Sequence, residues 1–363
     1  MSDLLDIKVR GIPDHFILEL TQRCNNRCLY CYTAWGAPRL NYNPNNQGEM
    51  STREVKNVIA KLQDETGLKT IGLSGGEPLL REDVPDLLSY IRRRGIAPYL
   101  ITNATLLNKE AAQAIANAKS GCEITLLSFR PEVHDMLAGR RGARDQAIAG
   151  ITNLAAAGIP PAVVFVATKI NYMDLYRTAE LAVTVGAAAL SYNRLNLGAH
   201  NLQFADRLLP SPSMIRENLD MLESLAEKYG VPIAAAVVIE PCVVDVRKYK
   251  HIQFGWCPLC SESSYFAIDP VGNVRICNHS PTILGNIRSQ SFLDIYFQHP
   301  YLQVFRETWA LECQDCDPEL KRLCGGGCKA AAEQCYGNLE HVDPFVTISK
   351  RIEENITPLV THS

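Results

Sequence analysis

Residues 15–31 read HFILELTQRCNNRCLYC, an apolar run followed at once by three cysteines. The first six residues are rich in Phe, Ile and Leu, which is typical of a strand buried on both faces. Cys24, Cys28 and Cys31 then follow with the spacing C-x3-C-x2-C, and no fourth cysteine is close in sequence. Three thiolates on one loop can hold three irons of a [4Fe–4S] cluster and leave the fourth iron open to a ligand. A structural zinc ion is the alternative, but it normally takes four protein ligands.

Similar apolar runs recur along the chain and alternate with helical patterns. The expected strands are residues 15–20, 70–75, 98–103, 123–128, 162–167 and 188–193. The expected helices are residues 51–66, 83–95, 108–119, 143–158, 172–186 and 212–230, the first opened by a capping box of Ser51 and Glu54. Repeated strand–helix–strand units give parallel strands with right-handed connections. The pattern predicts an α/β fold, a partial (β/α)6 TIM-like barrel, whose chemistry lies in the loops after the strands.

The composition excludes several classes of protein. The chain has 363 residues, 47% of them hydrophobic and 21% charged, and a net charge of -3. The basic runs at 92–94 and 140–141 are short, so we expect no nucleic-acid partner. No stretch approaches the roughly 20 apolar residues of a membrane helix, and the N-terminus does not resemble a signal peptide. We therefore expect a cytoplasmic protein without a membrane partner, in which 13 cysteines indicate metal or redox chemistry.

Eight of the cysteines gather near the C-terminus. They are Cys257, Cys260, Cys277, Cys313, Cys316, Cys324, Cys328 and Cys335. Eight thiolates are enough for two four-cysteine clusters, although two zinc sites are an alternative. Cys277 ends a predicted β-hairpin, and a helix is expected near 291–307. Cys122 and Cys242 stand apart, and we predict that both are small buried apolar residues.

These patterns divide the chain into an expected set of segments. They are an N-terminal segment at 1–14, a core at 15–230, a bridging segment at 231–256, a small cysteine-rich domain at 257–345 and a tail at 346–363. The last domain has too little apolar surface to fold without metal or disulfide cross-links.

The cysteine loop after the first strand resembles that of the radical S-adenosylmethionine (SAM) superfamily. Residues 75–78, GGEP, follow the second strand and look like the motif that contacts the SAM methionyl amine in that family. The resemblance implies a [4Fe–4S] cluster on Cys24, Cys28 and Cys31, whose open iron binds SAM. Reductive cleavage of SAM would give methionine and a 5′-deoxyadenosyl radical that abstracts hydrogen from a substrate.

The same resemblance implies further contacts with SAM. Tyr30 would lie against the adenine, and Gly75, Gly76 and Glu77 would bind the amine. Asn103 belongs to the sequence TNAT, which is similar to the family's TNGT, and Arg194 follows the sixth strand, where a polar pair with Asn193 often reaches SAM.

One segment departs from the family pattern. Many relatives carry Ser-x-Asp-Gly after the fourth strand, near the SAM ribose, whereas residues 126–134 read LLSFRPEVH. The missing Asp predicts an altered ribose pocket or substrate wall, to which Arg130 could contribute a charge.

The C-terminal cysteines resemble the SPASM domain, an auxiliary-cluster module of radical SAM peptide maturases. The resemblance implies one [4Fe–4S] cluster on Cys257, Cys260, Cys277 and Cys328, and another on Cys313, Cys316, Cys324 and Cys335. Seven residues separate Cys316 from Cys324, where the family usually has five. This longer spacing bears on whether Cys324 is a ligand of the second cluster.

The resemblance favours an oxidoreductase that modifies a peptide or protein side chain. Only about 15 residues precede the first strand, so we expect either a separate leader-peptide-binding protein or recognition without a leader. An electron donor such as flavodoxin or ferredoxin would supply the reducing electron. The alternative is a small-molecule reaction such as decarboxylation of a haem or tetrapyrrole side chain, and a zinc-stabilised binding protein is more distant.

The residue after Cys277 argues against a sulfatase-maturing role. Those enzymes place a catalytic Asp at this position, whereas the present chain has Asn278, and an amide cannot act as a general base. Asp269 and His279 are candidates for proton transfer, with hairpin and loop structure as their alternative roles.

Overall fold

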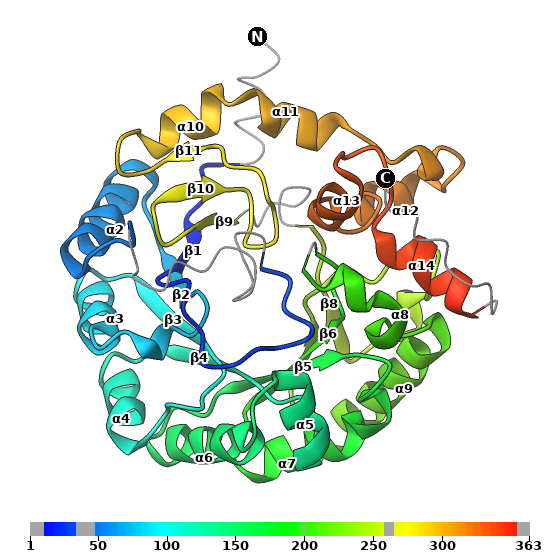
Figure 1. Cartoon of the computed structure of the whole chain (residues 1–363), viewed down its shortest axis with the longest axis horizontal. Coiled ribbons are helices and arrows are strands. Elements are labelled where there is room, and N and C mark those ends of the chain that lie inside the picture. The colour runs from blue at the N-terminus through cyan, green and yellow to red at the C-terminus, as the bar shows by residue number, and fades with distance from the viewer. Residues whose placement is uncertain (1–10, 34–47, 199, 258–264, 354–363) are drawn as a thin grey trace.

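The protein is built around one open sheet. The computed structural model describes residues 11–33, 48–198, 200–257 and 265–353. These residues form an eleven-stranded sheet in the order β11-β10-β9-β1-β2-β3-β4-β5-β6-β7-β8. β9 and β1 to β8 run parallel to one another, while β10 and β11 pair antiparallel. Because β8 and β11 do not pair, the sheet is a partial barrel, and Figure 1 shows its strands inside a ring of helices.

The strands are short and the helices between them cover the outer face. The strands are β1 (His15–Glu19), β2 (Thr70–Ser74), β3 (Ala97–Thr102), β4 (Gly121–Thr125), β5 (Ala162–Ala167), β6 (Ala189–Arg194), β7 (Ile233–Ala235), β8 (Ile252–Phe254), β9 (Tyr265–Ile268), β10 (Asn273–Arg275) and β11 (Gly285–Asn286). The helices of the first two thirds are α2 (Thr52–Thr66), α3 (Val84–Arg93), α4 (Lys109–Asn117), α5 (Pro131–Ala138), α6 (Ala143–Ala156), α7 (Leu175–Thr184), α8 (Ala205–Leu208) and α9 (Pro212–Tyr229). The C-terminal helices are α10 (Phe292–Gln298), α11 (Pro300–Glu307), α12 (Pro318–Cys324), α13 (Lys329–Tyr336) and α14 (Pro344–Glu353). Short 3-10 helices are η1 (Pro78–Leu80), η2 (Tyr172–Asp174), η3 (Leu202–Phe204), η4 (Val246–Lys248) and η6 (Leu311–Cys313).

The predicted α/β fold is confirmed. All six expected strands correspond to β1 to β6, and α2 begins with the predicted capping box, in which Ser51 and Glu54 cap each other. The helix expected near 291–307 is two helices, α10 and α11, because Pro300 has no N–H to continue the first one. The sequence analysis did not predict α5, which begins at Pro131.

The sheet continues beyond the six strands that the sequence predicted. β7 and β8 come from the segment expected to bridge two domains, and they extend the sheet past β6. On the other side, β9 pairs in parallel with β1, so the cysteine-rich region is hydrogen-bonded to the first strand. The proposed boundaries of the segments stay a prediction.

Aromatic side chains join the first strand to the C-terminal region. Phe16 of β1 packs edge-on against Phe292 of α10, with ring centroids 4.8 Å apart. Phe266 of β9 also packs against Phe292, at 5.2 Å. All three rings are fully buried, and such pairs add to the free energy gained from burial of their area. The first strand and the C-terminal region therefore share one hydrophobic core.

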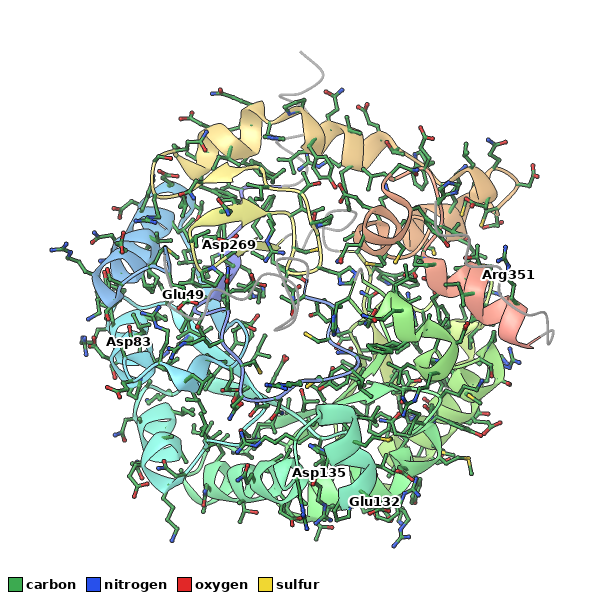
Figure 2. All side chains as sticks on the ribbon, in the orientation of Figure 1. Glu49, Asp83, Glu132, Asp135, Asp269 and Arg351 are labelled. Atoms are coloured by element: carbon green, nitrogen blue, oxygen red, sulfur yellow. The ribbon has the colours of Figure 1, made fainter. Side chains whose placement is uncertain are left out.

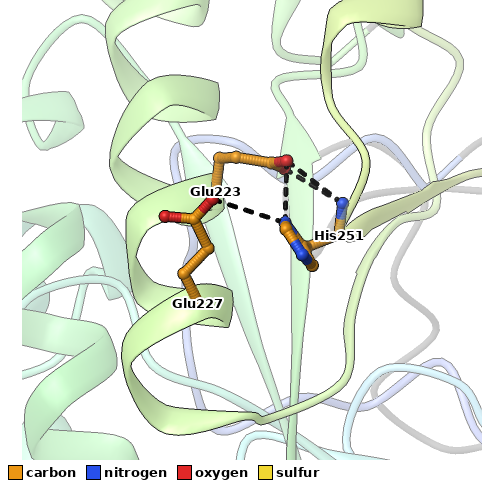
Figure 3. A group of neighbouring side chains, drawn as sticks. All are labelled: Glu223, Glu227 and His251. Carbon is orange, nitrogen blue, oxygen red and sulfur yellow. Dashed lines mark hydrogen bonds and ion pairs between the residues drawn. The ribbon is translucent and has the colours of Figure 1, made fainter.

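Polar contacts at the surface hold the last parallel strand, β8, against helix α9. The Glu223 carboxylate of α9 accepts a hydrogen bond from the backbone N–H of Lys250 at 2.7 Å. It also lies 2.9 Å from Nδ1 of His251 (Figure 3). Glu227 lies 3.9 Å from the same ring nitrogen. These contacts hold the chain at the start of β8 against α9.

Within the described ranges, none of the helices combines the length and the apolar character that crossing a bilayer requires.

Candidate functional site

Two loops at the carboxyl ends of β1 and β2 run against each other. The N–H of Gly76 donates to the carbonyl of Thr21 at 2.8 Å, and the N–H of Glu77 donates to that of Arg23 at 2.8 Å. A Cβ on Gly75 would lie 2.6 Å from the Thr21 oxygen, and one on Gly76 would lie 2.2 Å from the Arg23 oxygen. Gly75 also has a φ of 137°, which favours glycine. The two glycines thus let the second loop pack directly on the cysteine loop.

A carboxylate that the sequence analysis missed holds the start of the cysteine loop. Glu49 precedes α2 and accepts hydrogen bonds from the hydroxyl of Thr21 at 3.0 Å and from the N–H of Gln22 at 2.7 Å (Figure 2). No sequence signal marked Glu49, because the contact joins segments that are distant along the chain.

The three cysteines of this loop line one cavity. The cavity spans about 870 Å³ of space that is partly open to solvent. It lies at the ends of β1 to β4, where Gly75, Gly76 and Asn103 also line it. Burial raises the pKa of Cys24 to about 12 and also raises that of Cys28. Buried thiolates therefore need a positively charged group to hold them in that form. The donor set and the space fit an iron–sulfur cluster with room for a further ligand.

Glu77 and Asn103 connect the second and third strand ends. Glu77 is fully buried, and its carboxylate accepts from the hydroxyl of Thr102 at 2.6 Å and from the N–H of Asn103 at 2.8 Å. The carboxylate thus faces the end of β3, whereas the Asn103 amide faces the cysteine loop and lies 3.9 Å from the Cys24 sulfur. Ala104 takes a φ of 59°, where the family motif has glycine.

Two tyrosines separate this first cavity from a second one. Tyr30 and Tyr32 line both cavities. The Tyr32 hydroxyl accepts a hydrogen bond from the Asn278 amide at 2.7 Å, and its ring packs against that of His279 at 4.7 Å. Burial raises the pKa of both tyrosines, so both keep their hydroxyl protons. The sequence analysis named Tyr30 but not Tyr32.

The second cavity contains cysteines from three separate segments. It spans about 900 Å³ of space that is partly open to solvent, and it is lined by Cys257, Cys277 and Cys328 among other residues. These are three of the four residues that the resemblance assigned to one auxiliary cluster. The fourth, Cys260, lies outside the described residues. A buried ion pair between Glu19 of β1 and Arg275 of β10 holds the hairpin with Cys277 next to the first strand.

Several polar atoms in this second cavity have no partner among the described residues. They are Oδ1 of Asn193, Oδ1 of Asn196 and Nδ1 of His279, all of which are buried. The other ring nitrogen of His279 donates to the Leu197 carbonyl at 2.8 Å, and burial lowers the pKa of His279 to about 4, so the ring is neutral. Buried polar atoms without partners cost free energy and indicate a site for a bound group.

Arg194 lies away from the first cavity. Its guanidinium is fully buried and forms ion pairs with Glu240 at 2.8 Å and Asp343 at 2.5 Å. It also donates to the carbonyl of Val238 at 2.6 Å. In this structure Arg194 joins β6 to two distant segments rather than facing the cysteine loop.

Two other predicted candidates have structural partners. Asp269 accepts hydrogen bonds from the N–H groups of Val271 and Asn273, at 3.0 Å and 2.9 Å, and so shapes the hairpin turn (Figure 2). Arg130 forms an ion pair with Asp174 at 3.0 Å. Its charge is therefore already engaged.

The two isolated cysteines differ from each other. Cys122 is buried in β4, as predicted. Cys242 is exposed, so the prediction that it is a buried apolar residue is wrong. Spacing along the chain carries no information about whether a single cysteine is buried or exposed.

Known proteins are similar to this chain over most of its length. The PqqA peptide cyclase of Granulibacter bethesdensis is 26% identical over 348 residues, which cover 93% of this chain and 88% of that protein. The AdoMet-dependent heme synthase of Methanosarcina barkeri is 26% identical over 363 residues, covering 93% of this chain and 97% of that protein.

Solved structures share the fold. Streptococcus suis SuiB bound to S-adenosylmethionine superposes with a TM-score of 0.73 at 16% identity, covering 94% of this chain and 79% of SuiB. The enzyme anSMEcpe with bound AdoMet and a Cp18Cys peptide superposes with a TM-score of 0.70 at 16% identity, covering 95% and 96%.

Two family profiles match the sequence itself, and between them they cover more than half of it. One is the radical SAM superfamily, over residues 18–182, and the other is the SPASM iron–sulfur cluster-binding domain, over residues 257–317. The chain therefore belongs to the radical SAM superfamily of enzymes and carries a SPASM domain after its radical SAM core.

Proposed function

We propose that this enzyme modifies a side chain of a peptide or protein by hydrogen abstraction. The observation that carries the proposal is the pair of adjoining cavities, which share Tyr30 and Tyr32 and contain cysteines from both ends of the chain. The side chains of Tyr30 and Tyr32 would then lie between a substrate in the second cavity and the cluster and SAM in the first.

The first cavity would hold the SAM-binding cluster on Cys24, Cys28 and Cys31. When bound there, the cluster and SAM supply the 5′-deoxyadenosyl radical. Gly75 and Gly76 keep the cysteine loop and the second loop in contact, and Asn103 holds the loop from the side of β3. Tyr30 would pack against the adenine, and Glu77 would act by positioning Asn103.

The second cavity would hold an auxiliary cluster on Cys257, Cys260, Cys277 and Cys328. A second auxiliary cluster would use Cys313, Cys316 and Cys324. Burial raises the pKa of Cys328 to about 12, so this thiol also requires a cationic group to become a ligand.

The lining of the second cavity favours a neutral, amide-rich substrate. Its cationic residues in the described part of the chain are Arg194 and Lys329, and both already have protein partners. The ammonium of Lys329 donates to the carbonyls of Phe305 and Thr308, each at 2.7 Å. The amides of Asn193 and Asn196 instead offer free acceptor oxygens, which suit the N–H groups of a peptide.

A tetrapyrrole is the second candidate substrate, since one relative is named a heme synthase. The propionate groups of a tetrapyrrole are carboxylates, which bind best to cations that are free to pair with them. Arg194 and Lys329 already interact with protein groups, so neither is available to bind a propionate. This favours a peptide as the substrate.

The reaction would also need partners. An electron donor such as flavodoxin or ferredoxin would reduce the SAM-binding cluster. A separate leader-peptide-binding protein would present the substrate if the peptide carries a leader.

Substrate class can be tested with anaerobically purified and reconstituted enzyme, SAM and a reductant. The peptides to use are those encoded by short reading frames beside the gene, in unlabelled and perdeuterated form. We expect a change in peptide mass and transfer of deuterium into 5′-deoxyadenosine. The Cys28→Ala variant should release no 5′-deoxyadenosine.

A parallel reaction contains a tetrapyrrole with propionate side chains. Loss of carbon dioxide from the tetrapyrrole, with every peptide unchanged, would replace the peptide proposal by the small-molecule one. Undiminished SAM cleavage by Cys28→Ala would contradict the role of the cysteine loop.

A further inference from the structure

Three of the C-terminal cysteines gather around one glycine-rich turn. Cys313 ends η6 and Cys324 ends α12, and the N–H of Cys316 donates to the carbonyl of Cys313 at 3.3 Å. A Cβ on Gly326 would lie 4.0 Å from the Cys313 sulfur, which shows that the turn after α12 packs against η6. The turn itself is closed by a hydrogen bond from the N–H of Gly327 to the Cys324 carbonyl at 3.1 Å.

A second turn, from the segment after β7, packs on the same glycines. Its first residue is Glu240, whose carbonyl accepts from the N–H groups of Val243 at 2.8 Å and Val244 at 3.0 Å. A Cβ on Gly327 would lie only 2.3 Å from the Glu240 carboxylate, so no other residue fits there. Cys242 lies within this turn.

The buried charges fix how the two turns meet. Arg194 pairs with Glu240, on the turn that carries Cys242, and with Asp343, whose N–H donates to the carbonyl of Gly326 at 3.0 Å. The Asp343 carboxylate also accepts from the N–H of Cys328 at 3.0 Å. One cation therefore holds the Cys242 turn and the glycine-rich turn together.

Electrostatic interactions agree that Cys242 is close to the other thiols. Burial raises the pKa of Cys313, and the neighbouring thiols of Cys316 and Cys242 raise it further. Burial and Glu240 raise the pKa of Cys324 to about 12, and Cys242 again contributes. These interactions agree with the packing of the turn that carries Cys242 on the glycine-rich turn.

Cys335 has different surroundings. It lies in the last turn of α13, so about 10 Å of helix separates it from the glycine-rich turn, which precedes the first turn of that helix. Burial raises its pKa to about 12, and the charged neighbour that adds to this shift is Asp343. In the part of the chain that the structure describes, none of the other cysteines contributes to this shift.

We propose that Cys242, in place of Cys335, completes the ligand set of the second auxiliary cluster with Cys313, Cys316 and Cys324. The inference rests on the proposed function, which supplies the cluster. Four thiolates from three segments would then surround one site, as an iron–sulfur cluster requires. The insertion between Cys316 and Cys324 is accommodated by α12, which carries Cys324 back to the turn.

The test compares alanine variants of the full chain after anaerobic reconstitution. Wild-type protein should bind about twelve irons, four for each of three clusters. Cys242→Ala should lose about a third of the iron and one of the electron paramagnetic resonance (EPR) signals of the reduced protein. Cys335→Ala and the buried control Cys122→Ala should keep the iron content and the signals of the wild type.

A serine variant keeps the test decisive if the alanine variant folds poorly. Cys242→Ser can ligate iron through oxygen, so it should retain iron but shift one EPR signal, whereas Cys335→Ser should not. The inference is overturned if the Cys335 variants change the iron or the signals as much as the Cys242 variants do, or if neither does. A wild type that binds a single cluster would overturn the proposed auxiliary clusters as well.

Discussion

Asn193 shows how one residue can favour function over stability. Its side-chain oxygen is buried in the second cavity and has no partner among the described residues. Replacing such an atom by an apolar group of similar shape removes its desolvation penalty. We expect Asn193→Leu to raise the free energy of unfolding by about 1 kcal/mol and to weaken substrate binding by about tenfold.

Asn218 provides the control for this prediction. It is also buried, but its amide donates to the Tyr172 carbonyl at 2.8 Å and its oxygen accepts from the Tyr192 hydroxyl at 3.2 Å. Asn218→Leu should therefore destabilise the protein by about 2 kcal/mol in chemical denaturation. If both variants destabilise equally, the Asn193 oxygen has a partner in the folded protein.

His134 makes the stability of the core depend on pH. Its Nδ1 accepts a hydrogen bond from the N–H of Leu127 at 3.1 Å, and burial lowers its pKa from 6.5 to about 4. Between these two values the unfolded chain binds a proton that the folded protein does not, so stability falls as the pH falls. Between pH 7.5 and 5.0 the wild type should lose about 2 kcal/mol more than His134→Asn, whose amide oxygen can replace Nδ1 as the acceptor.

Urea unfolding at several pH values measures this difference. Parallel pH profiles for the two proteins would mean that His134 becomes protonated in the folded state.

At the scale of the elements, the contact between the first two strand ends is the most constrained. Gly76→Ala would place a carbon 2.2 Å from the Arg23 carbonyl, so the cysteine loop must move. We expect this variant to lose iron from the first cluster and to release 5′-deoxyadenosine at least about tenfold more slowly, since displacement of catalytic groups is costly.

Gly121→Ala is the matched glycine variant. A Cβ at this position would lie 3.4 Å from Cβ of Tyr99, which is an acceptable contact, so iron content and SAM cleavage should stay near those of the wild type. Normal activity in Gly76→Ala would contradict this prediction, because it would show that the two loops can move apart without loss of iron or of SAM cleavage.

The sequence predicted the repeating elements because each has its own local pattern. The strands β1 to β6 are apolar runs, and α2 carries its capping box in four residues. The three-residue strands β7 and β8 gave no such signal, since their pairing depends on strands already in place. The break between α10 and α11 was marked by Pro300 and could have been predicted.

The candidate site could be predicted from its motifs only in part. The cysteine loop, Gly75, Gly76 and Asn103, which the resemblance named, line one cavity, and their contacts with SAM stay a prediction. Glu49 and Tyr32 were missed, because each contacts residues far away in the sequence. Arg194 was expected at the first cavity, but two carboxylates that the sequence does not connect with it hold it elsewhere.

At the scale of the whole molecule, Arg194 connects three regions. It belongs to β6, Glu240 follows β7, and Asp343 precedes α14. Removing one partner of a buried ion pair leaves charges without compensation, so Arg194→Met should lower the free energy of unfolding by about 3–5 kcal/mol. Chemical denaturation of the reconstituted protein measures the effect.

The exposed pair of Arg247 and Asp245 is the comparison. It has similar chemistry and an N–O distance of 2.8 Å, but water surrounds it, so Arg247→Met should leave the free energy of unfolding nearly unchanged. An equal loss in both variants would contradict the role of burial.

The parallel pairing of β1 with β9 has a consequence for the order of synthesis. On the ribosome, about 250 residues separate the end of β1 from the start of β9, which takes about 12 to 50 s to translate. During that interval one edge of the nascent β1 has no neighbour, and such an edge invites aggregation. The cysteine loop that follows β1 also lacks the hairpin of β9 and β10 during this interval. The strand edge and the loop beside it therefore become covered only after most of the chain has been made.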